Sequence, residues 1–189
     1  MAIQGQTGTY HLAVNPKQYS PQRQNCYEFI VTGLDNLVQQ GSDRVMVNAA
    51  EVLRFSATKV DIPHFSQSVI SIKRGNTEMK FAGAMTFSEG SLVINDYIGA
   101  DGKSVLYAWQ ALSGNILTEA VGDAADYKKD CVLLEYTPDF KTVVRQFELK
   151  GCWIRQLSED GFDAENDGKK TVTATIVFDK AVMVPPDEE

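Results

Sequence analysis

The sequence predicts a mainly β protein, an antiparallel β-sandwich or distorted barrel of two sheets with seven to nine strands, one α-helix and extended arms or loops. Apolar and polar residues alternate with a period of two in one segment after another, which is typical of half-buried strands. Only residues 101–112 show helical spacing instead. We expect an N-terminal arm (1–25), a single β-sandwich domain (26–181) and an acidic C-terminal tail (182–189).

The expected strands follow one another along most of the chain. The last is the clearest, because Val172, Ala174, Ile176 and Phe178 fall on one face and threonines on the other. Residues 88–91 (SEGS) predict a tight turn between two strands, with a glycine available for positive φ. The other expected strands are 27–31, 52–60, 68–73, 79–87, 92–95, 132–137 and 143–149, the last two forming a second hairpin around 138–139.

The single expected helix covers 101–112. Asp101 can cap its first turn and Gly114 can end it. We expect Trp109 to anchor this helix against the sheets rather than to stack on a ligand. The apolar residues at helical spacing are Val105, Leu106, Trp109 and Leu112.

The composition excludes several classes of protein. Of the 189 residues 43% are apolar, and 25 acidic groups outweigh 18 basic ones, for a net charge of −7. A protein that binds DNA by neutralising phosphates needs a basic face, so this mode of binding is not expected. The N-terminal residues lack the pattern of a signal peptide, and no apolar run reaches the roughly 18 to 20 residues of a membrane span. We expect a soluble globular protein without a membrane anchor.

The acidic excess lies entirely in the C-terminal part of the chain. Residues 1–118 carry nine basic and nine acidic groups, whereas residues 119–189 carry nine and sixteen. Much of the excess lies in residues 158–170 and in the final residues 185–189. Such segments are typically a solvated loop and a frayed tail. The alternative is a surface that repels another anion.

The three cysteines of the chain form no C-x-x-C motif and cannot all pair with one another. This fits free, buried thiols in a reducing interior better than a disulfide framework. The cysteines are Cys26, Cys131 and Cys152.

No motif for catalysis is complete. The triplet Gly102-Lys103-Ser104 ends like a phosphate-binding loop, but Tyr97 stands where that motif needs a glycine. Residues 163–168 place oxygen ligands as a calcium loop does, but Ala174 occupies the twelfth position, where a bidentate carboxylate is required. We expect no enzyme, no cofactor and no metal centre; a weak cation site at 163–168, and a hydrolase that depends on it, stay open as alternatives. The two histidines, too few for a metal cluster, are His11 and His64.

The order of segments along the chain carries more information than any single motif. A strand, an Arg-Gly turn, a second strand, a helix and a Cys-Trp strand follow one another between residues 27 and 181. In this order the chain resembles the tail tube proteins of bacteriophages, particularly the contractile-tailed type. The segments that carry the resemblance are 73–83 (KRGNTEMKFAG), 95–101 (NDYIGAD), 108–109 (AW), 134–139 (LEYTPD), 149–154 (LKGCWI) and the Thr-rich strand before 178–179 (FD).

The resemblance implies a structural virion protein of the phage tail, assembled in the cytoplasm of the host bacterium. Six copies would close into a homohexameric ring, and stacked rings would form the hollow tube through which double-stranded DNA passes without specific binding. Tail sheath, baseplate and tail terminator proteins would be its partners. Edge strands paired around a closed ring would no longer be exposed to aggregation. The loop 38–50 could bridge to the next ring, and the residues expected at the subunit interface are Gly41, Arg44, Arg74 and Asp96.

Two other functions stay open from the sequence. The same fold forms the inner tube of phage-like bacteriocins and of type VI secretion systems, which carry no DNA. A carbohydrate-binding or other ligand-binding β-sandwich would instead expose Trp109, Trp153 and Tyr97 as stacking platforms, although both tryptophans lie in segments with an apolar pattern.

Overall fold

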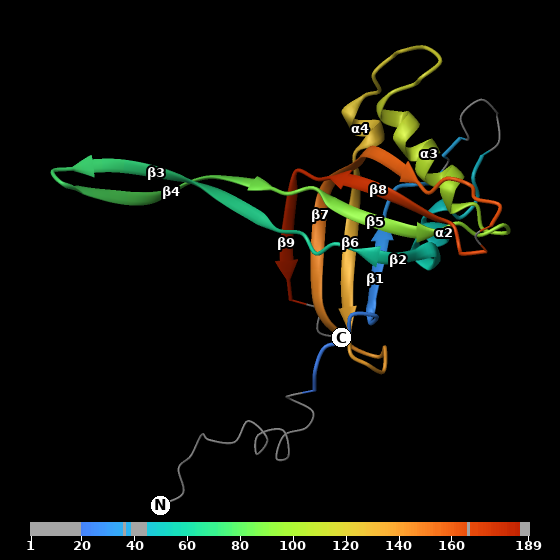
Figure 1. Ribbon diagram of the computed structural model, residues 1–189, viewed down its shortest axis with the longest axis horizontal. Coiled ribbons are helices and arrows are strands. Elements are labelled where there is room, and N and C mark those ends of the chain that lie inside the picture. Colours follow the sequence, from blue (N-terminus) through green and yellow to red (C-terminus); the bar gives the residue numbers. More distant parts are fainter. Residues whose placement is uncertain (1–19, 36, 39–44, 166, 186–189) are drawn as a thin grey trace, which may run out of the picture.

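The computed structural model describes residues 20–35, 37–38, 45–165 and 167–185 (Figure 1). Strands dominate this part of the chain, and the predicted mainly β class is confirmed. The strands are β1 (Tyr27–Val31), β2 (Ala57–Val60), β3 (Phe65–Arg74), β4 (Thr77–Phe87), β5 (Gly90–Asn95), β6 (Lys129–Tyr136), β7 (Val143–Glu159), β8 (Thr171–Val177) and β9 (Lys180–Val184). The helices are α2 (Ala49–Ser56), α3 (Gly102–Ser113) and α4 (Ala124–Tyr127).

One long strand links the two halves of the main sheet. The described strands of this sheet follow the order β1-β6-β7-β8-β5-β2, and β9 also pairs with β7. The first part of β7 pairs antiparallel with β6 and β9, and its last part pairs antiparallel with β8. Gly151, between the two parts, has a φ of +69°, which favours glycine, and a Cβ there would lie 2.3 Å from Oδ2 of Asp179 and would displace that carboxylate. The sheet folds over at β7, and β1, β6 and β9 run across β8, β5 and β2 (Figure 1).

The apolar core fills the space inside this folded sheet and beneath α2 and α3. The alternation predicted for the last strand is confirmed, since Val172, Ala174 and Ile176 are all buried. The three cysteines are free and buried, as predicted. None of the helices that the structure describes is long and apolar enough to cross a membrane.

The predicted helix is confirmed as α3. The Ser104 backbone N–H donates a hydrogen bond of 3.0 Å to the Asp101 side chain, which is the predicted cap, and the helix ends at Gly114. The triplet 102–104 forms its first turn, as expected. Trp109 is 1% exposed, and its indole N–H donates to the carbonyl of Tyr127 at 3.0 Å. Its burial in the core with residues of the main sheet makes it the expected anchor, and the hydrogen bond also joins α3 to the α4 turn.

The prediction of a single helix, and of a strand over 52–60, is wrong. Residues 49–56 form α2, and only Ala57–Val60 is extended as β2. In α2 the buried residues Ala49, Leu53 and Ser56 recur at helical spacing, so burial on one face of a short helix decides the local structure. The short helix α4 was not predicted either.

The turn predicted at 88–91 does not join a hairpin. In the structure β4 pairs with β3, whereas β5, which begins at Gly90, pairs with β2 and β8. The segment therefore returns the chain from one sheet to another. The strands 68–73 and 79–87 exist within β3 and β4, but they are exposed almost throughout instead of half-buried.

The C-terminal half contains more strand than predicted. The strand expected over 143–149 continues to Glu159, and β9 reaches Val184, past the expected domain boundary at 181. The division into arm, domain and tail stays a prediction. Trp153 is only half-buried, with its ring 5.9 Å from that of Tyr127.

Candidate functional site

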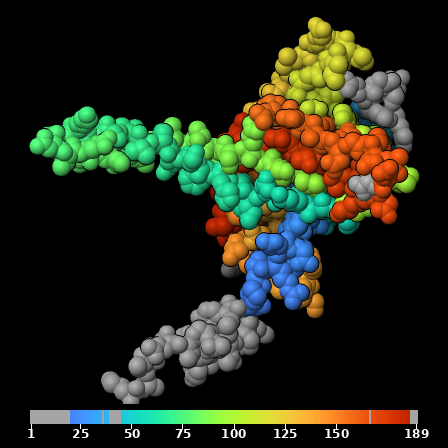
Figure 2. Space-filling view, in the orientation of Figure 1, coloured from blue at the N-terminus to red at the C-terminus, as the bar shows by residue number. Residues whose placement is uncertain are grey.

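The hairpin of β3 and β4 projects far from the body of the protein (Figures 1 and 2). Its strands pair with each other from Phe65 opposite Phe87 to Arg74 opposite Thr77, and they form a separate two-stranded sheet. Gly75, with a φ of +65°, makes the turn at the tip. A two-stranded hairpin alone is marginally stable in water, so a projection of this length is expected to be held by a partner.

Four large apolar side chains form one continuous patch on the outer half of the hairpin. Ile70 stands opposite Phe81 and Ile72 opposite Met79, so the four side chains share a face. They are 44–54% exposed. We call these four residues the hairpin patch. The opposite face of the same segment is polar, because it carries the pairs Ser71–Lys80 and Lys73–Glu78.

The base of the hairpin is fixed to the core. The Phe87 ring lies 6.0 Å from that of Phe178 and 6.1 Å from that of Phe65. Farther out the register shifts between Gln67 and Val69, and a Cβ on Gly83 would lie 2.3 Å from the Ser68 hydroxyl. Glycine is thus required at this irregularity, which bends the strand pair. The hairpin therefore has an anchored base and an outer apolar face without cover from the rest of the described chain.

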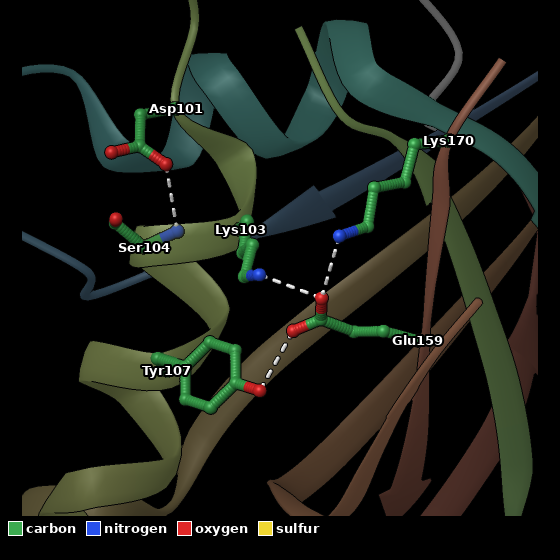
Figure 3. Close-up of polar contacts among 6 residues, drawn as sticks. All are labelled: Asp101, Lys103, Ser104, Tyr107, Glu159 and Lys170. Carbon is green, nitrogen blue, oxygen red and sulfur yellow. Dashed lines mark hydrogen bonds and ion pairs between the residues drawn. The ribbon is translucent and has the colours of Figure 1, made fainter. Parts of the chain in front are cut away.

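A second polar site ties α3 to the end of β7 (Figure 3). The Glu159 carboxylate accepts hydrogen bonds from the Lys103 ammonium at 2.6 Å and the Tyr107 hydroxyl at 2.7 Å. Lys170 forms an ion pair with it at 3.3 Å. These contacts, the one from Lys103 first, lower the pKa of Glu159 from 4.5 to about 2. Glu159 thus has a structural role, and the segment 158–170 is not the uniformly solvated loop that was expected.

Glu159→Gln should lower the free energy of unfolding at pH 7 by about 1 to 2 kcal/mol, after allowing for solvent screening. The folded-state pKa lies below the unfolded one, so the stabilisation is full above about pH 4.5 and is lost as the pH falls toward 2. Urea unfolding from pH 7 to 3 should therefore show the two proteins converging. Glu165→Gln, at an exposed position, should change the unfolding free energy by less than about 0.5 kcal/mol. A constant gap between Glu159→Gln and the wild type across this range would contradict the assignment.

The structure does not gather the four residues expected at a subunit interface. Arg74 ends β3 at the hairpin tip, and Asp96 follows β5 at the other end of the molecule (Figure 1). Asp96 is half-buried, and its backbone N–H donates to the Lys170 carbonyl at 3.0 Å. Gly41, Arg44 and the two residues between them lie outside the described residues. Their interface roles stay predictions.

The potential metal ligands of the described chain do not cluster. Within residues 20–35, 37–38, 45–165 and 167–185, no three His, Cys, Asp or Glu side chains converge on one point. Asn166 of the calcium-like segment lies outside this part of the chain. Lys103 of the phosphate-loop-like triplet is bound to Glu159. A groove of about 860 Å³ runs between β1 and β2, but its lining places no nucleophile beside a histidine.

The fold is shared by chains in solved structures of contractile injection systems. A chain of the PVC sheath–tube complex in the extended state superposes with a TM-score of 0.61 at 17% identity, covering 95% of this chain and 99% of that one. A chain in the structure of the anti-feeding prophage cap gives a TM-score of 0.61 at 14% identity, covering 87% and 91%. At these identities the likeness is one of fold.

The sequence itself is similar to named tail tube proteins. Tail tube protein gp19 of Enterobacteria phage T4 is 28% identical over 108 residues, which are 55% of this chain and 65% of that protein. Tail tube protein gp19 of Enterobacteria phage T6 is 29% identical over the same extent. The chain thus spans just under two thirds of the length of these curated relatives. No protein-family model matches the sequence. The resemblance to phage tail tube proteins is confirmed by these relatives.

Proposed function

We propose that this chain is a non-enzymatic structural subunit of a contractile phage tail, and that hexameric rings of it stack into the hollow tube that conducts viral DNA into the host cell. The observation that carries the proposal is the projecting β3–β4 hairpin, whose apolar patch has no cover within the described chain. Such a surface calls for burial in an assembly. The similarity to tail tube proteins supports the choice of assembly.

The expected partners follow from the same role. Copies of this chain would be the main partner, with sheath, baseplate and tail terminator proteins next, in a virion tail assembled in the host cytoplasm. The likeness to a chain of a sheath–tube complex supports a sheathed tube. The same likeness supports the inner tube of a phage-like bacteriocin or secretion apparatus as the second candidate function. Contact with DNA would be transient, because a subunit of charge −7 does not attract phosphates.

Electron microscopy of the purified protein over a range of concentrations tests the proposal. We expect six-fold rings at low concentration and stacked tubes at high concentration, with light scattering reporting the shift in mass. Lumenal DNA is not required for either species. A monomer that persists at every concentration and salt condition would contradict the proposal. If tubes formed only in the presence of an added sheath protein, the proposal would hold for assembly together with the sheath, and not for assembly of this chain alone.

The ligand-binding alternative keeps only one exposed ring among its three expected stacking platforms. Trp109 is buried, and Trp153 packs at its edge against Tyr127. Tyr97 is 47% exposed, but its hydroxyl receives a hydrogen bond from the Asn95 amide. No pair of exposed aromatic rings is therefore left among these three residues to sandwich a sugar.

A further inference from the structure

We infer that the tip of the β3–β4 hairpin docks on the connection between β7 and β8 of a second copy of this chain. This inference rests on the proposed function and specifies which surfaces meet in the assembly. The two surfaces lie at opposite ends of the longest axis of the molecule (Figure 1). One subunit therefore offers both surfaces at once to different neighbours.

The hairpin tip combines apolar surface with positive charge. Between residues 73 and 80 it carries Lys73, Arg74 and Lys80 against Glu78, a net charge of +2 on a protein of charge −7. The hairpin patch begins beside these residues, with Ile72 and Met79 nearest the turn. A docking partner should thus offer an apolar group surrounded by carboxylates.

The β7–β8 connection has this composition. Phe162 is 93% exposed, and the Lys170 ammonium lies 3.6 Å from the centre of its ring. This cation–π contact holds the ring in place while leaving most of it open to solvent. The connection, 160–170, has a net charge of −2, because Lys169 and Lys170 offset part of the charge of its carboxylates, which are Asp160, Asp163, Glu165 and Asp167.

Two hydrogen bonds constrain the described part of the connection. The Thr171 hydroxyl donates a hydrogen bond of 3.0 Å to Asp160, and the Glu165 backbone N–H donates one of 3.0 Å to Asp163. An ordered surface loses less conformational entropy on binding. An exposed aromatic ring held in this way, and flanked by carboxylates, complements the apolar, basic tip in both polarity and charge.

A contact between opposite ends of the same molecule is heterologous. In a tube it repeats from subunit to subunit instead of closing on itself in a pair. In a tube of stacked rings such a contact runs from one ring to the next and sets the order in which rings add. Charge opposition would then guide the encounter of rings, and the apolar groups would be buried on docking.

Charge reversal tests the contact. Arg74→Glu with Lys80→Glu changes the tip, and Glu165→Lys with Asp167→Lys changes the connection; all four side chains are exposed. Each double variant should raise the critical concentration for tube assembly, measured by sedimentation, at least about tenfold, because like charges then face each other. Combining all four substitutions should restore the critical concentration to within about threefold of the wild-type value. Lys141→Glu, in the β6–β7 turn, is the control and should assemble normally.

Site-specific cross-linking separates this contact from the proposed function. Asn76→Cys at the tip and Gly161→Cys in the connection occupy open positions, and the native cysteines are buried. A short bismaleimide should join tip to connection in a mixture of the two variants, but not tip to tip. Tubes without this cross-link, or a fourfold variant no better than the doubles, would overturn the contact and leave the tube function standing. A tip-to-connection cross-link in a protein that never forms tubes would support the contact and contradict the tube function.

Discussion

Phe81→Asp should abolish tube assembly and leave the folded monomer intact. Phe81 sits in the hairpin patch, far from the core, and about half of its side chain is exposed in the subunit. Burial of the rest of an apolar side chain contributes on the order of 1 kcal/mol at each contact. An unpaired carboxylate buried there instead costs several kcal/mol more. Since every subunit repeats the contact, the loss recurs throughout the tube.

Sedimentation and electron microscopy should find only small species of Phe81→Asp at concentrations where the wild type forms tubes. Thermal unfolding of the small species should match that of wild-type monomer, because the substituted side chain touches no core residue. Phe140→Asp is the matched control: it makes the same substitution at a phenylalanine that is 55% exposed in the β6–β7 turn, away from the hairpin. If both variants assembled equally well, the patch would not be part of the interface.

For the hairpin, the sequence predicts the strands and the turn but not the surface that covers them. Alternation in 68–73 and 79–87 correctly predicted strands, and the Arg-Gly turn between them is the observed tip. Alternation defines two faces, but it does not say whether the covering surface belongs to the same chain or to another one. The pattern that predicts half-burial in a sandwich is here satisfied only if a second copy covers the patch.

The local pattern of apolar residues also fails to predict the structure where burial depends on segments far away in the sequence. In 52–60 the apolar residues fit a strand nearly as well as a helix, and the choice is settled by packing of α2 against β1 and α3. Glu159 contacts Lys103 across 56 residues of sequence, so no local motif could have marked it. By contrast, the α3 cap was predictable, because Asp101 and Ser104 lie within one helical turn, and the helical spacing of the apolar residues marked Trp109 as buried.

The acidic charge now divides into parts with different roles. Glu159 is neutralised by two lysines and ties α3 to β7. The carboxylates from 160 to 168 share the β7–β8 connection with Phe162, and this connection lies at the end of the molecule opposite the hairpin tip (Figure 1). In the proposed assembly these carboxylates face the basic tip of a neighbour rather than DNA. Repulsion of DNA in the lumen must then come from other carboxylates of the chain.

Trp109→Ala should cost about 3 to 5 kcal/mol in the free energy of unfolding. The side chain is 1% exposed and lies between α3 and the sheet, so truncation leaves a large cavity in the core. It also removes the donor to the Tyr127 carbonyl, which holds the α4 turn against α3. Because a domain of this kind has only about 5 to 15 kcal/mol of stability in total, the variant is expected to be marginally folded at 37 °C.

Urea unfolding followed by far-ultraviolet circular dichroism measures the loss at 25 °C. Trp109→Phe keeps most of the apolar volume but leaves the Tyr127 carbonyl without its indole donor, so it should lose about 1 to 2 kcal/mol. Comparing the two variants separates the free-energy cost of the cavity from that of the lost hydrogen bond. Equal and small losses in both variants would mean that Trp109 is not the anchor of α3. Because assembly needs a folded body to carry the hairpin, Trp109→Ala should also form fewer tubes, and a rise in tube yield on cooling to 25 °C would trace that deficit to stability rather than to the interface.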